Sequence, residues 1–295
     1  MHSHDHASDD SNQRRVLLAL AVTAAFMVVE VVGGILSGSL ALLADAGHML
    51  TDSMALALAA MAFHVGKRPA DHRRTFGYLR TQVLAAFVNG ITLLFVVGWI
   101  LFEAVKRFVD PPDIAGPMML GVAAAGLIVN IVAFAVLHGG DQDNLNIRGA
   151  ALHVAGDLLG SVAAIVAAIV IIYTGWLLID PILSLAVAAL IFKSAWVLIK
   201  RSAHVLLQGS PEWLDAESMQ AKIMTAVPEV RGVHHVHVWG LTPQHLVLTM
   251  HIKVEELGAN CTHTVRQVKQ LLESEYGIGH STIEIEVDEC ADRHS

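Results

Sequence analysis

Residues 40–63 read LALLADAGHMLTDSMALALAAMAF, an apolar run that contains three ionisable side chains, Asp45, His48 and Asp52. A run of about 20 apolar residues is long enough to cross a bilayer as one helix. The three ionisable groups follow one another at i, i+3 and i+7, so they share one face of that helix. Because an ionisable group at membrane depth costs at least ~2.5 kcal/mol, this stretch predicts a membrane helix with a functional polar face.

Five further runs of similar length predict a polytopic α-helical membrane protein with six transmembrane helices. The expected spans are Val16–Leu36, Leu40–Phe63, Val83–Phe102, Pro117–Leu137, Ala150–Tyr173 and Trp176–Ile199. The composition agrees, since 54% of the 295 residues are hydrophobic and only 16% are charged, against roughly 25% charged residues in a soluble domain. So apolar a chain is not disordered. Its net charge of −8 argues against a nucleic-acid partner.

Basic residues beside the spans indicate the orientation of the chain. Ten Lys or Arg residues flank one side of the expected bundle, and only Lys106 and Arg107 flank the other. The positive-inside rule places the richer side, with both termini, in the cytoplasm. The connectors at residues 37–39 and 174–175 are so short that the spans they join must form adjacent helical hairpins.

A second polar pair occurs in the fifth expected span, where His153 precedes Asp157 by four residues, just as His48 precedes Asp52. Two helices that each offer one imidazole and one carboxylate supply four ligands for one ion. Such a set suits a tetrahedral borderline cation, above all Zn²⁺, whereas Mg²⁺ prefers six oxygens. We therefore expect these four residues to form an intramembrane metal site, with Asp45 as a candidate accessory ligand.

The composition changes near residue 208, and the remaining residues predict a small soluble domain. The expected elements are a helix at Pro211–Val227, strands at Val230–Gly240 and Leu246–Val254, a helix at Cys261–Tyr276 and a strand at Thr282–Val287. This αββαβ order predicts a small, ferredoxin-like α+β domain at residues 208–295. The rest divides into a histidine-bearing tail at residues 1–13 and the six-helix membrane domain at residues 14–207.

Together these features resemble the cation diffusion facilitator family, in its zinc-transporting branch. The two His-x-x-x-Asp pairs carry most of the resemblance. Shorter matching stretches are Ser37–His48, Thr75–Arg80, Asp180-Pro181 and His237-Val238-Trp239. The connector Gly139–Asn146 contains no histidine, which favours the bacterial type over eukaryotic relatives that have a histidine-rich loop there.

The resemblance implies a homodimeric secondary transporter, not an enzyme, embedded in the lipid of the inner membrane. It implies export of Zn²⁺ from the cytoplasm in exchange for protons. The order of metal affinities leaves Cd²⁺, Co²⁺ and Ni²⁺ open as cargo of the same transporter. The chemistry of the residues agrees with an exchange for protons. Metal binding requires neutral imidazole and ionised carboxylate, so protonation of the ligands releases the metal.

A second metal site, in the cytoplasmic domain, is also implied by the resemblance, with Zn²⁺ as a regulatory ion. Its expected ligands are His234, His251, His263 and Glu286. The two cysteines, Cys261 and Cys290, are candidates for further ligands, because thiolates favour zinc in a reducing compartment.

The connector between the second and third spans holds a weaker candidate site. Asp71 and His72 are ligand types, but Arg74 and Tyr78 stand where relatives with this site have histidines. The sequence therefore predicts at most weak metal binding there.

Two other functions remain open at the level of the sequence. A membrane metal sensor would bind the ion at the same residues without transporting it. An intramembrane zinc hydrolase would need three protein ligands, an open coordination position and a general base. The sequence contains no His-Glu-x-x-His motif, and four ligands would close the coordination shell.

Overall fold

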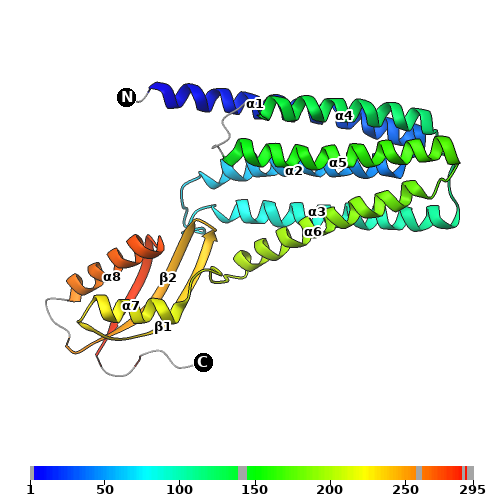
Figure 1. Cartoon of the computed structure of the whole chain (residues 1–295). Helices are drawn as coiled ribbons and strands as arrows, with labels where there is room; N and C mark the ends of the chain where they lie inside the picture. Colours follow the sequence, from blue (N-terminus) through cyan, green and yellow to red (C-terminus); the bar gives the residue numbers. More distant parts are fainter. Residues whose placement is uncertain (1–2, 139–144, 257–260, 288–289, 291–295) are drawn as a thin grey trace. The chain divides into compact units, whose positions relative to one another are not determined.

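A computed structural model describes residues 3–138, 145–256, 261–287 and 290 of the chain. Within the helices, the side chains of residues 3–17, 19–20, 56, 59–60, 63, 137, 145–153 and 155 lie outside this description. The described residues form eight helices and three strands, in the order α1 to α6, α7, β1, β2, α8 and β3 (Figure 1).

Six long helices make up the N-terminal part of the chain. They are α1 (Ser3–Ser37), α2 (Leu40–Gly66), α3 (Arg80–Val109), α4 (Gly116–His138), α5 (Leu145–Thr174) and α6 (Ile179–Leu206). Each helix contains most or all of one expected span. The expected N-terminal tail is largely part of α1, because that helix already begins at Ser3.

Four of these helices contain stretches that are long and apolar enough to cross a membrane, within the residues that the structure describes. The stretches are Arg80–Val109, Gly116–Val136, Gly156–Thr174 and Ile179–Leu206, and α1 adds a shorter apolar stretch at Ala21–Ser37. The helices also expose large apolar side chains, among them Phe95, Leu190 and Trp196. Such exposure is expected of helices that face lipid rather than water.

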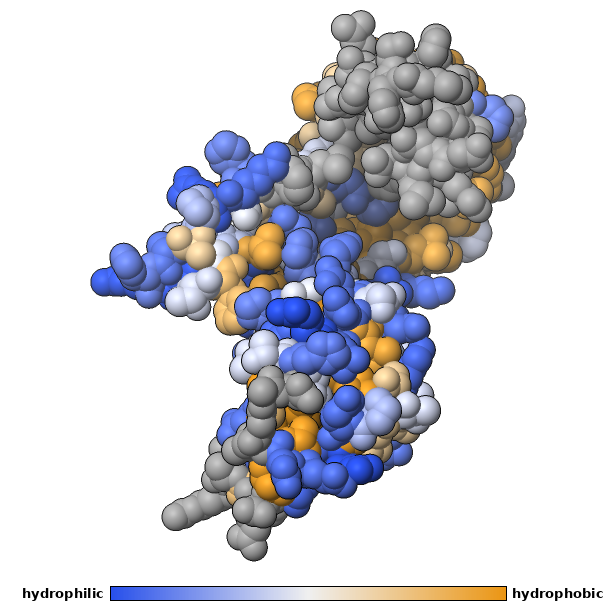
Figure 2. Space-filling view, turned by 90° about the vertical axis from the view of Figure 1, so that its left-hand side faces the viewer, coloured by the Kyte–Doolittle hydropathy of each residue, from blue (hydrophilic) through white to orange (hydrophobic). Residues whose placement is uncertain are grey.

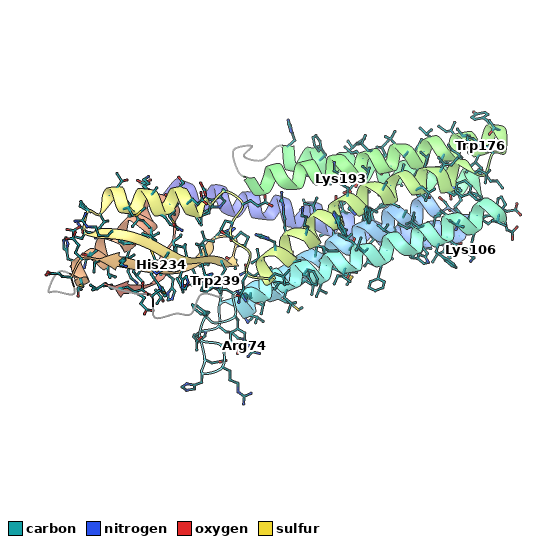
Figure 3. The ribbon with its side chains drawn as sticks, turned by 90° about the horizontal axis from the view of Figure 1, so that it is seen from below. Arg74, Lys106, Trp176, Lys193, His234 and Trp239 are labelled. Atoms are coloured by element: carbon teal, nitrogen blue, oxygen red, sulfur yellow. The ribbon has the colours of Figure 1, made fainter. Side chains whose placement is uncertain are left out.

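Two tight turns at one end of the bundle form the expected hairpins. Gly38, between α1 and α2, has φ +73, and Gly175, between α5 and α6, has φ +68. A Cβ at Gly38 would also lie 2.8 Å from the carbonyl oxygen of Asp113, so this turn requires glycine. Figure 3 shows Lys106 and Trp176 at this same end of the helices.

Helix α2 lies between two sets of neighbours inside the bundle. Leu40 and Ala44 pack in a buried cluster with residues of α3 and α6. Ala41 and Leu42 pack in another with residues of α4 and α5. The helix that carries His48 and Asp52 is therefore held from both sides.

The C-terminal domain consists of α7 (Ala216–Ala226), β1 (Val230–Thr242), β2 (His245–Val254), α8 (Cys261–Tyr276) and β3 (His280–Glu286). The sheet has the order β1-β2-β3, in which β1 and β2 are antiparallel and β2 and β3 are parallel. Both helices pack on this sheet, since Met219, Ile223 and Leu272 are fully buried with Leu248 and Ile252. The αββαβ order is as predicted, and the fuller ferredoxin-like assignment stays a prediction.

The first helix of this domain begins later than predicted, at Ala216 instead of Pro211. The reason is local, because Asp215 has an extended backbone and caps the helix by accepting a hydrogen bond from Glu217 N at 3.2 Å. Pro211 instead begins a separate turn that Leu214 N closes by donating to its carbonyl.

The contacts divide the chain into two compact units. One comprises Met1–Ala59 with Val88–Leu198, and the other comprises Ala60–Phe87 with Ile199–Ser295. The second unit is larger than the expected domain at 208–295, because it includes the α2–α3 connector and the adjoining helix ends. In Figure 2 hydrophilic side chains cover much of the surface in the lower part of the view, and apolar side chains show between them.

Candidate metal centres

The polar face of α2 lies in the interior of the bundle. His48 Nε2 is 3.5 Å from Asp52 Oδ2, and both side chains are half-buried. Asp157 on α5 is only 4% exposed. The backbone of α5 places His153 one turn before Asp157, but the side chain of His153 lies outside the described residues. Three of the four expected ligands are therefore described, on two helices that pack against each other.

Asp45 lies in the contact between α2 and α5. It is 4% exposed, and a Cβ at Gly160 would come within 2.9 Å of its Oδ1 atom. Its carboxylate is close enough to Asp157 for the two charges to interact. This position suits the accessory role expected of Asp45, which stays a prediction.

Two further polar residues lie in the same interior, although they were not among the expected ligands. Glu30 on α1 is 1% exposed, and a Cβ at Gly126 would lie 2.9 Å from its Oε1 atom. Asn130 on α4 donates a hydrogen bond to Ser161 Oγ at 3.1 Å. Their signal in the sequence is a polar residue inside an apolar run.

A buried carboxylate fixes the beginning of α2. Asp180 is fully buried near the start of α6, and it accepts hydrogen bonds from Leu40 N at 2.7 Å, Ala41 N at 3.1 Å and Ser39 Oγ at 2.6 Å. Arg107 Nη1 on α3 lies 3.2 Å from Asp180 Oδ2. A carboxylate at the N-terminus of a helix accepts hydrogen bonds from the unpaired N–H groups there and interacts favourably with the helix dipole. Asp180 therefore sets where the site-bearing helix begins.

The α2–α3 connector, where Arg74 is labelled in Figure 3, is organised by hydrogen bonds to Asp71. Asp71 Oδ1 accepts from Arg73 N at 2.8 Å and Arg74 N at 2.7 Å, and its Oδ2 accepts from the Tyr78 hydroxyl at 2.7 Å. Arg74 Nη1 donates to Tyr78 Oη at 3.1 Å. The hydrogen bond from Tyr78, followed by those from the backbone of Arg74 and Arg73, lowers the pKa of Asp71. His72 is exposed.

Both carboxylate oxygens of Asp71 are thus engaged within the turn, and the guanidinium group of Arg74 lies beside them. A cation would have to displace these donors. The expected weak metal site at Asp71 and His72 has no support in this geometry, and it stays an untested prediction.

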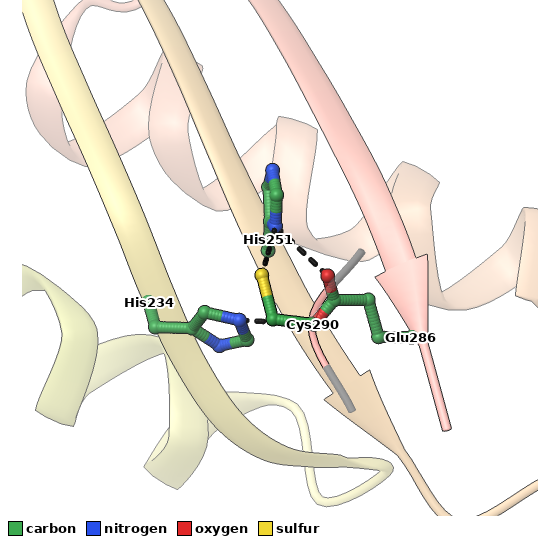
Figure 4. Close-up of side chains that lie close together, drawn as sticks. All are labelled: His234, His251, Glu286 and Cys290. Carbon is green, nitrogen blue, oxygen red and sulfur yellow. Dashed lines mark hydrogen bonds and ion pairs between the residues drawn. The ribbon is translucent and has the colours of Figure 1, made fainter. Parts of the chain in front are cut away.

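Four side chains of types that can bind a metal come together across the three strands of the C-terminal sheet (Figure 4). They are His234 on β1, His251 on β2, Glu286 at the end of β3, and Cys290 beyond it. The strand register pairs His234 with His251. One potential ligand atom from each of the four residues lies within 4.8 Å of the others.

Both carboxylate oxygens of Glu286 lie close to imidazole nitrogen atoms of this cluster. Glu286 Oε1 is 2.9 Å from His251 Nδ1, and Glu286 Oε2 is 2.9 Å from His234 Nε2. Burial raises the pKa of Glu286, but hydrogen bonds from Cys290 and His251 and the charges of the two histidines outweigh burial and hold it below its ordinary value. The carboxylate is therefore ionised at neutral pH, as a metal ligand must be.

The cluster differs from the set that the resemblance implied. His263 is exposed on α8 and is not one of these four residues. Cys290 joins the cluster instead, with its Sγ atom 3.5 Å from His251 Nδ1. Cys261, at the start of α8, places its Sγ atom 4.0 Å from the carbonyl oxygen of Glu256. Only the fold distinguishes the two cysteines.

Comparisons with known proteins find two family models along the chain. Residues 16–207 match the family model of the cation efflux transmembrane domain, and residues 214–288 match that of the cation efflux protein, cytoplasmic domain. The solved structure of a metal-bound C-terminal domain of the CzcD transporter from Cupriavidus metallidurans is also similar, with 27% identity and a TM-score of 0.23. It covers 25% of this chain and 100% of that one.

Several curated bacterial proteins are similar over almost the whole chain. The zinc transporter ZitB of Pectobacterium atrosepticum is 50% identical, over 99% of this chain and 91% of that protein. The metal cation efflux system protein CzcD of Cupriavidus metallidurans is 42% identical, over 98% of this chain and 90% of that protein. The cadmium, cobalt and zinc/H(+)-K(+) antiporter of Bacillus velezensis is 41% identical, over 97% of this chain and 91% of that protein.

Proposed function

Because the chain belongs to the cation efflux family, also called the cation diffusion facilitator family, we propose that it exports Zn²⁺ from the cytoplasm in exchange for protons. It is a multi-pass membrane protein of a family that carries out metal cation efflux, and its relatives are named as transporters rather than enzymes. The observation that carries the proposal is the polar face of α2, where His48 lies 3.5 Å from Asp52. This helix packs against α5, which carries the buried carboxylate of Asp157.

The transported ion binds to His48, Asp52, His153 and Asp157. Two imidazoles and two carboxylates form a complete tetrahedral shell for Zn²⁺. The two carboxylates also neutralise the dication, which lowers the large cost of placing a charge inside a membrane bundle. Zinc as the main cargo is supported by the name of the 50% identical relative, and Cd²⁺ and Co²⁺ as further cargo by the name of the 41% identical one.

Protons and metal compete for the same ligand atoms in this account. Protonation of an imidazole or a carboxylate removes a ligand, so incoming protons expel the ion on the outer side. Histidine is suited to this exchange, because an unperturbed imidazole titrates near pH 6.5. The relative named as an antiporter supports the coupling. The bundle alternates between an inward-open and an outward-open arrangement around the fixed site.

The C-terminal domain acts as a cytoplasmic regulatory domain and as the contact between two copies of the chain. Its proposed metal ligands are His234, His251 and Glu286, with His263 as a weaker candidate. Both termini lie in the cytoplasm, which follows from the distribution of basic residues, and the membrane is the inner membrane of a bacterium.

Zn²⁺ flux into proteoliposomes distinguishes this transporter from a sensor that binds zinc without moving it. We expect wild-type protein to accumulate Zn²⁺ in the vesicle lumen, and His48→Ala to abolish this flux. His64→Ala is the matched control, since His64 is an exposed histidine near the end of the same helix, and it should transport normally. Zinc binding to wild-type protein without flux would favour the sensor.

A further inference from the structure

We propose that Cys290 supplies a thiolate to the cytoplasmic metal site, which makes this a four-ligand site for soft or borderline d¹⁰ cations such as Zn²⁺ and Cd²⁺. The inference rests on the proposed metal binding by His234, His251 and Glu286, and it adds both a ligand and a preference among metals. The thiol is the least expected member of the set, because it lies beyond the last strand of the domain.

The first support is distance. With Zn–S and Zn–N bonds of about 2.3 and 2.05 Å, sulfur and nitrogen ligands of one tetrahedral ion lie about 3.6 Å apart. Cys290 Sγ is 3.5 Å from His251 Nδ1. The other donor atoms fall within 4.8 Å of one another, so small side-chain rotations are enough to place all four around one ion. Figure 4 shows the sulfur directed toward His251.

The second support comes from two buried polar atoms of the cluster. Glu286 is only 7% exposed, and its Oε2 atom has no hydrogen-bond partner among the described residues. His234 Nε2 also has no hydrogen-bond partner among the described residues, although it lies 2.9 Å from Glu286 Oε2. Buried polar atoms that face each other without hydrogen-bond geometry are costly unless a further group satisfies them. A cation bound to both atoms would do so.

Charge favours the thiolate as the fourth ligand. If Glu286 were the only anionic ligand, a bound dication would leave the buried site with one uncompensated positive charge. A Cys290 thiolate brings the charge of the complete site to zero, with neutral imidazoles on His234 and His251. Thiolate and imidazole donors together select Zn²⁺ and Cd²⁺ over hard ions such as Mg²⁺ and Mn²⁺.

The chain contains its own control, because Cys261 is its only other cysteine. Both thiols are half-buried, so exposure alone does not separate their reactivities. Cys261 lies at the start of α8 and is not part of the cluster. Metal bound as proposed should therefore protect one thiol and not the other.

The test measures alkylation of each cysteine by iodoacetamide in the reduced full-length protein, with mass spectrometry, before and after addition of Zn²⁺. The protein carries His48→Ala, so that the membrane site does not contribute. A thiolate bound to metal is a poor nucleophile, and we expect Zn²⁺ to slow alkylation of Cys290 by about tenfold or more. Alkylation of Cys261 should not change. Equal rates at Cys290 with and without Zn²⁺ would overturn the proposal.

Co²⁺ as a spectroscopic probe separates direct ligation from indirect shielding of the thiol. A Co²⁺–thiolate bond gives a charge-transfer band in the near ultraviolet, which we expect in Cys261→Ser and not in Cys290→Ser. A band that survives in Cys290→Ser would contradict the assignment. These readouts do not depend on flux, so a negative result with Zn²⁺ transport intact would remove the ligand role of Cys290 and leave the transporter proposal standing.

Discussion

Arg107 on α3 and Asp180 on α6 form an ion pair in the interior of the bundle, with 3.2 Å between Arg107 Nη1 and Asp180 Oδ2. Arg107 Nη1 also donates to the carbonyl oxygen of Gly38 at 2.5 Å. Asp180 in turn accepts hydrogen bonds from the first backbone N–H groups of α2, those of Leu40 and Ala41. The pair therefore joins α3 and α6 to the start of the helix that carries His48 and Asp52.

Removing Asp180 should destabilise the protein strongly. Asp180→Ala removes the acceptor of the Leu40 and Ala41 N–H groups and one partner of Arg107, which keeps its contacts with Glu103 and the Gly38 carbonyl. We therefore expect a loss of about 3 kcal/mol, the lower end of the cost of breaking a buried pair from one side. Thermal unfolding in detergent measures the loss. Lys106→Ala is the control, because Lys106 is the neighbouring cation but is 60% exposed, where an ion pair contributes about 0–1 kcal/mol. Similar unfolding midpoints for the two variants would contradict this role of Asp180.

Two glycines of α5 should respond in opposite directions to the same substitution. In Gly160→Ala the new methyl group meets Asp45 Oδ1 at 2.9 Å, and such overpacking costs about 1–3 kcal/mol. In Gly156→Ala the new methyl group meets no described atom within 4 Å, and the substitution gains up to about 1 kcal/mol of helix propensity. Thermal unfolding of the two variants checks the prediction. If Gly160→Ala were as stable as Gly156→Ala, the close approach of Asp45 to α5 would be wrong.

The hydrogen bonds to Asp71 should make the α2–α3 connector sensitive to acid. The pKa of Asp71 lies below its ordinary value of 3.8, so ionised Asp71 stabilises the turn above that pH. This contribution is lost as the pH falls through the lower, folded-state pKa. The titration of the Asp71 carboxyl carbon by NMR, assigned with Asp71→Asn, measures the midpoint.

Tyr78→Phe should move that midpoint upward, because the hydroxyl of Tyr78 is the largest cause of the lowered pKa. His72→Ala is the control, since His72 is an exposed neighbour in the same connector, and it should leave the midpoint unchanged. A midpoint at or above 3.8 in the wild-type protein would show that the connector does not hold Asp71 in this way.

The cytoplasmic zinc ion should depend on His251 and not on His263. His251 is nearly buried within the donor cluster, whereas His263 is exposed on α8. In a His48→Ala background, zinc content after dialysis should fall in His251→Ala and stay unchanged in His263→Ala. Loss of zinc in the His263 variant would instead favour the ligand set that the family resemblance implied.

Much of the fold follows from local sequence patterns. The six apolar runs correspond to α1–α6. The αββαβ order of the C-terminal domain is also as predicted, because the periodicity of apolar residues reflects which face of a single helix or strand is buried. The predicted start of α7 at Pro211 is wrong by five residues, because Asp215 caps the helix and Ala216 begins it.

The parts of the candidate sites that could not be predicted depend on contacts between distant residues. Asp180 caps a helix that begins 140 positions earlier in the chain. Cys290 reaches His251 across 39 positions, whereas Cys261 looked equally suitable in the sequence. The pairs His48–Asp52 and His153–Asp157 were visible because one helix turn joins each pair.

The central claim is that one intramembrane site exchanges Zn²⁺ for protons. The most direct measurement records Zn²⁺ entry and lumenal pH together in proteoliposomes whose accessible proteins expose the cytoplasmic side outward. We expect that an acidic lumen speeds Zn²⁺ entry, that the lumen becomes more alkaline as Zn²⁺ enters, and that His153→Ala abolishes both signals. Zn²⁺ entry that ignores the proton gradient and leaves the lumenal pH unchanged, or that persists in His153→Ala, would contradict it.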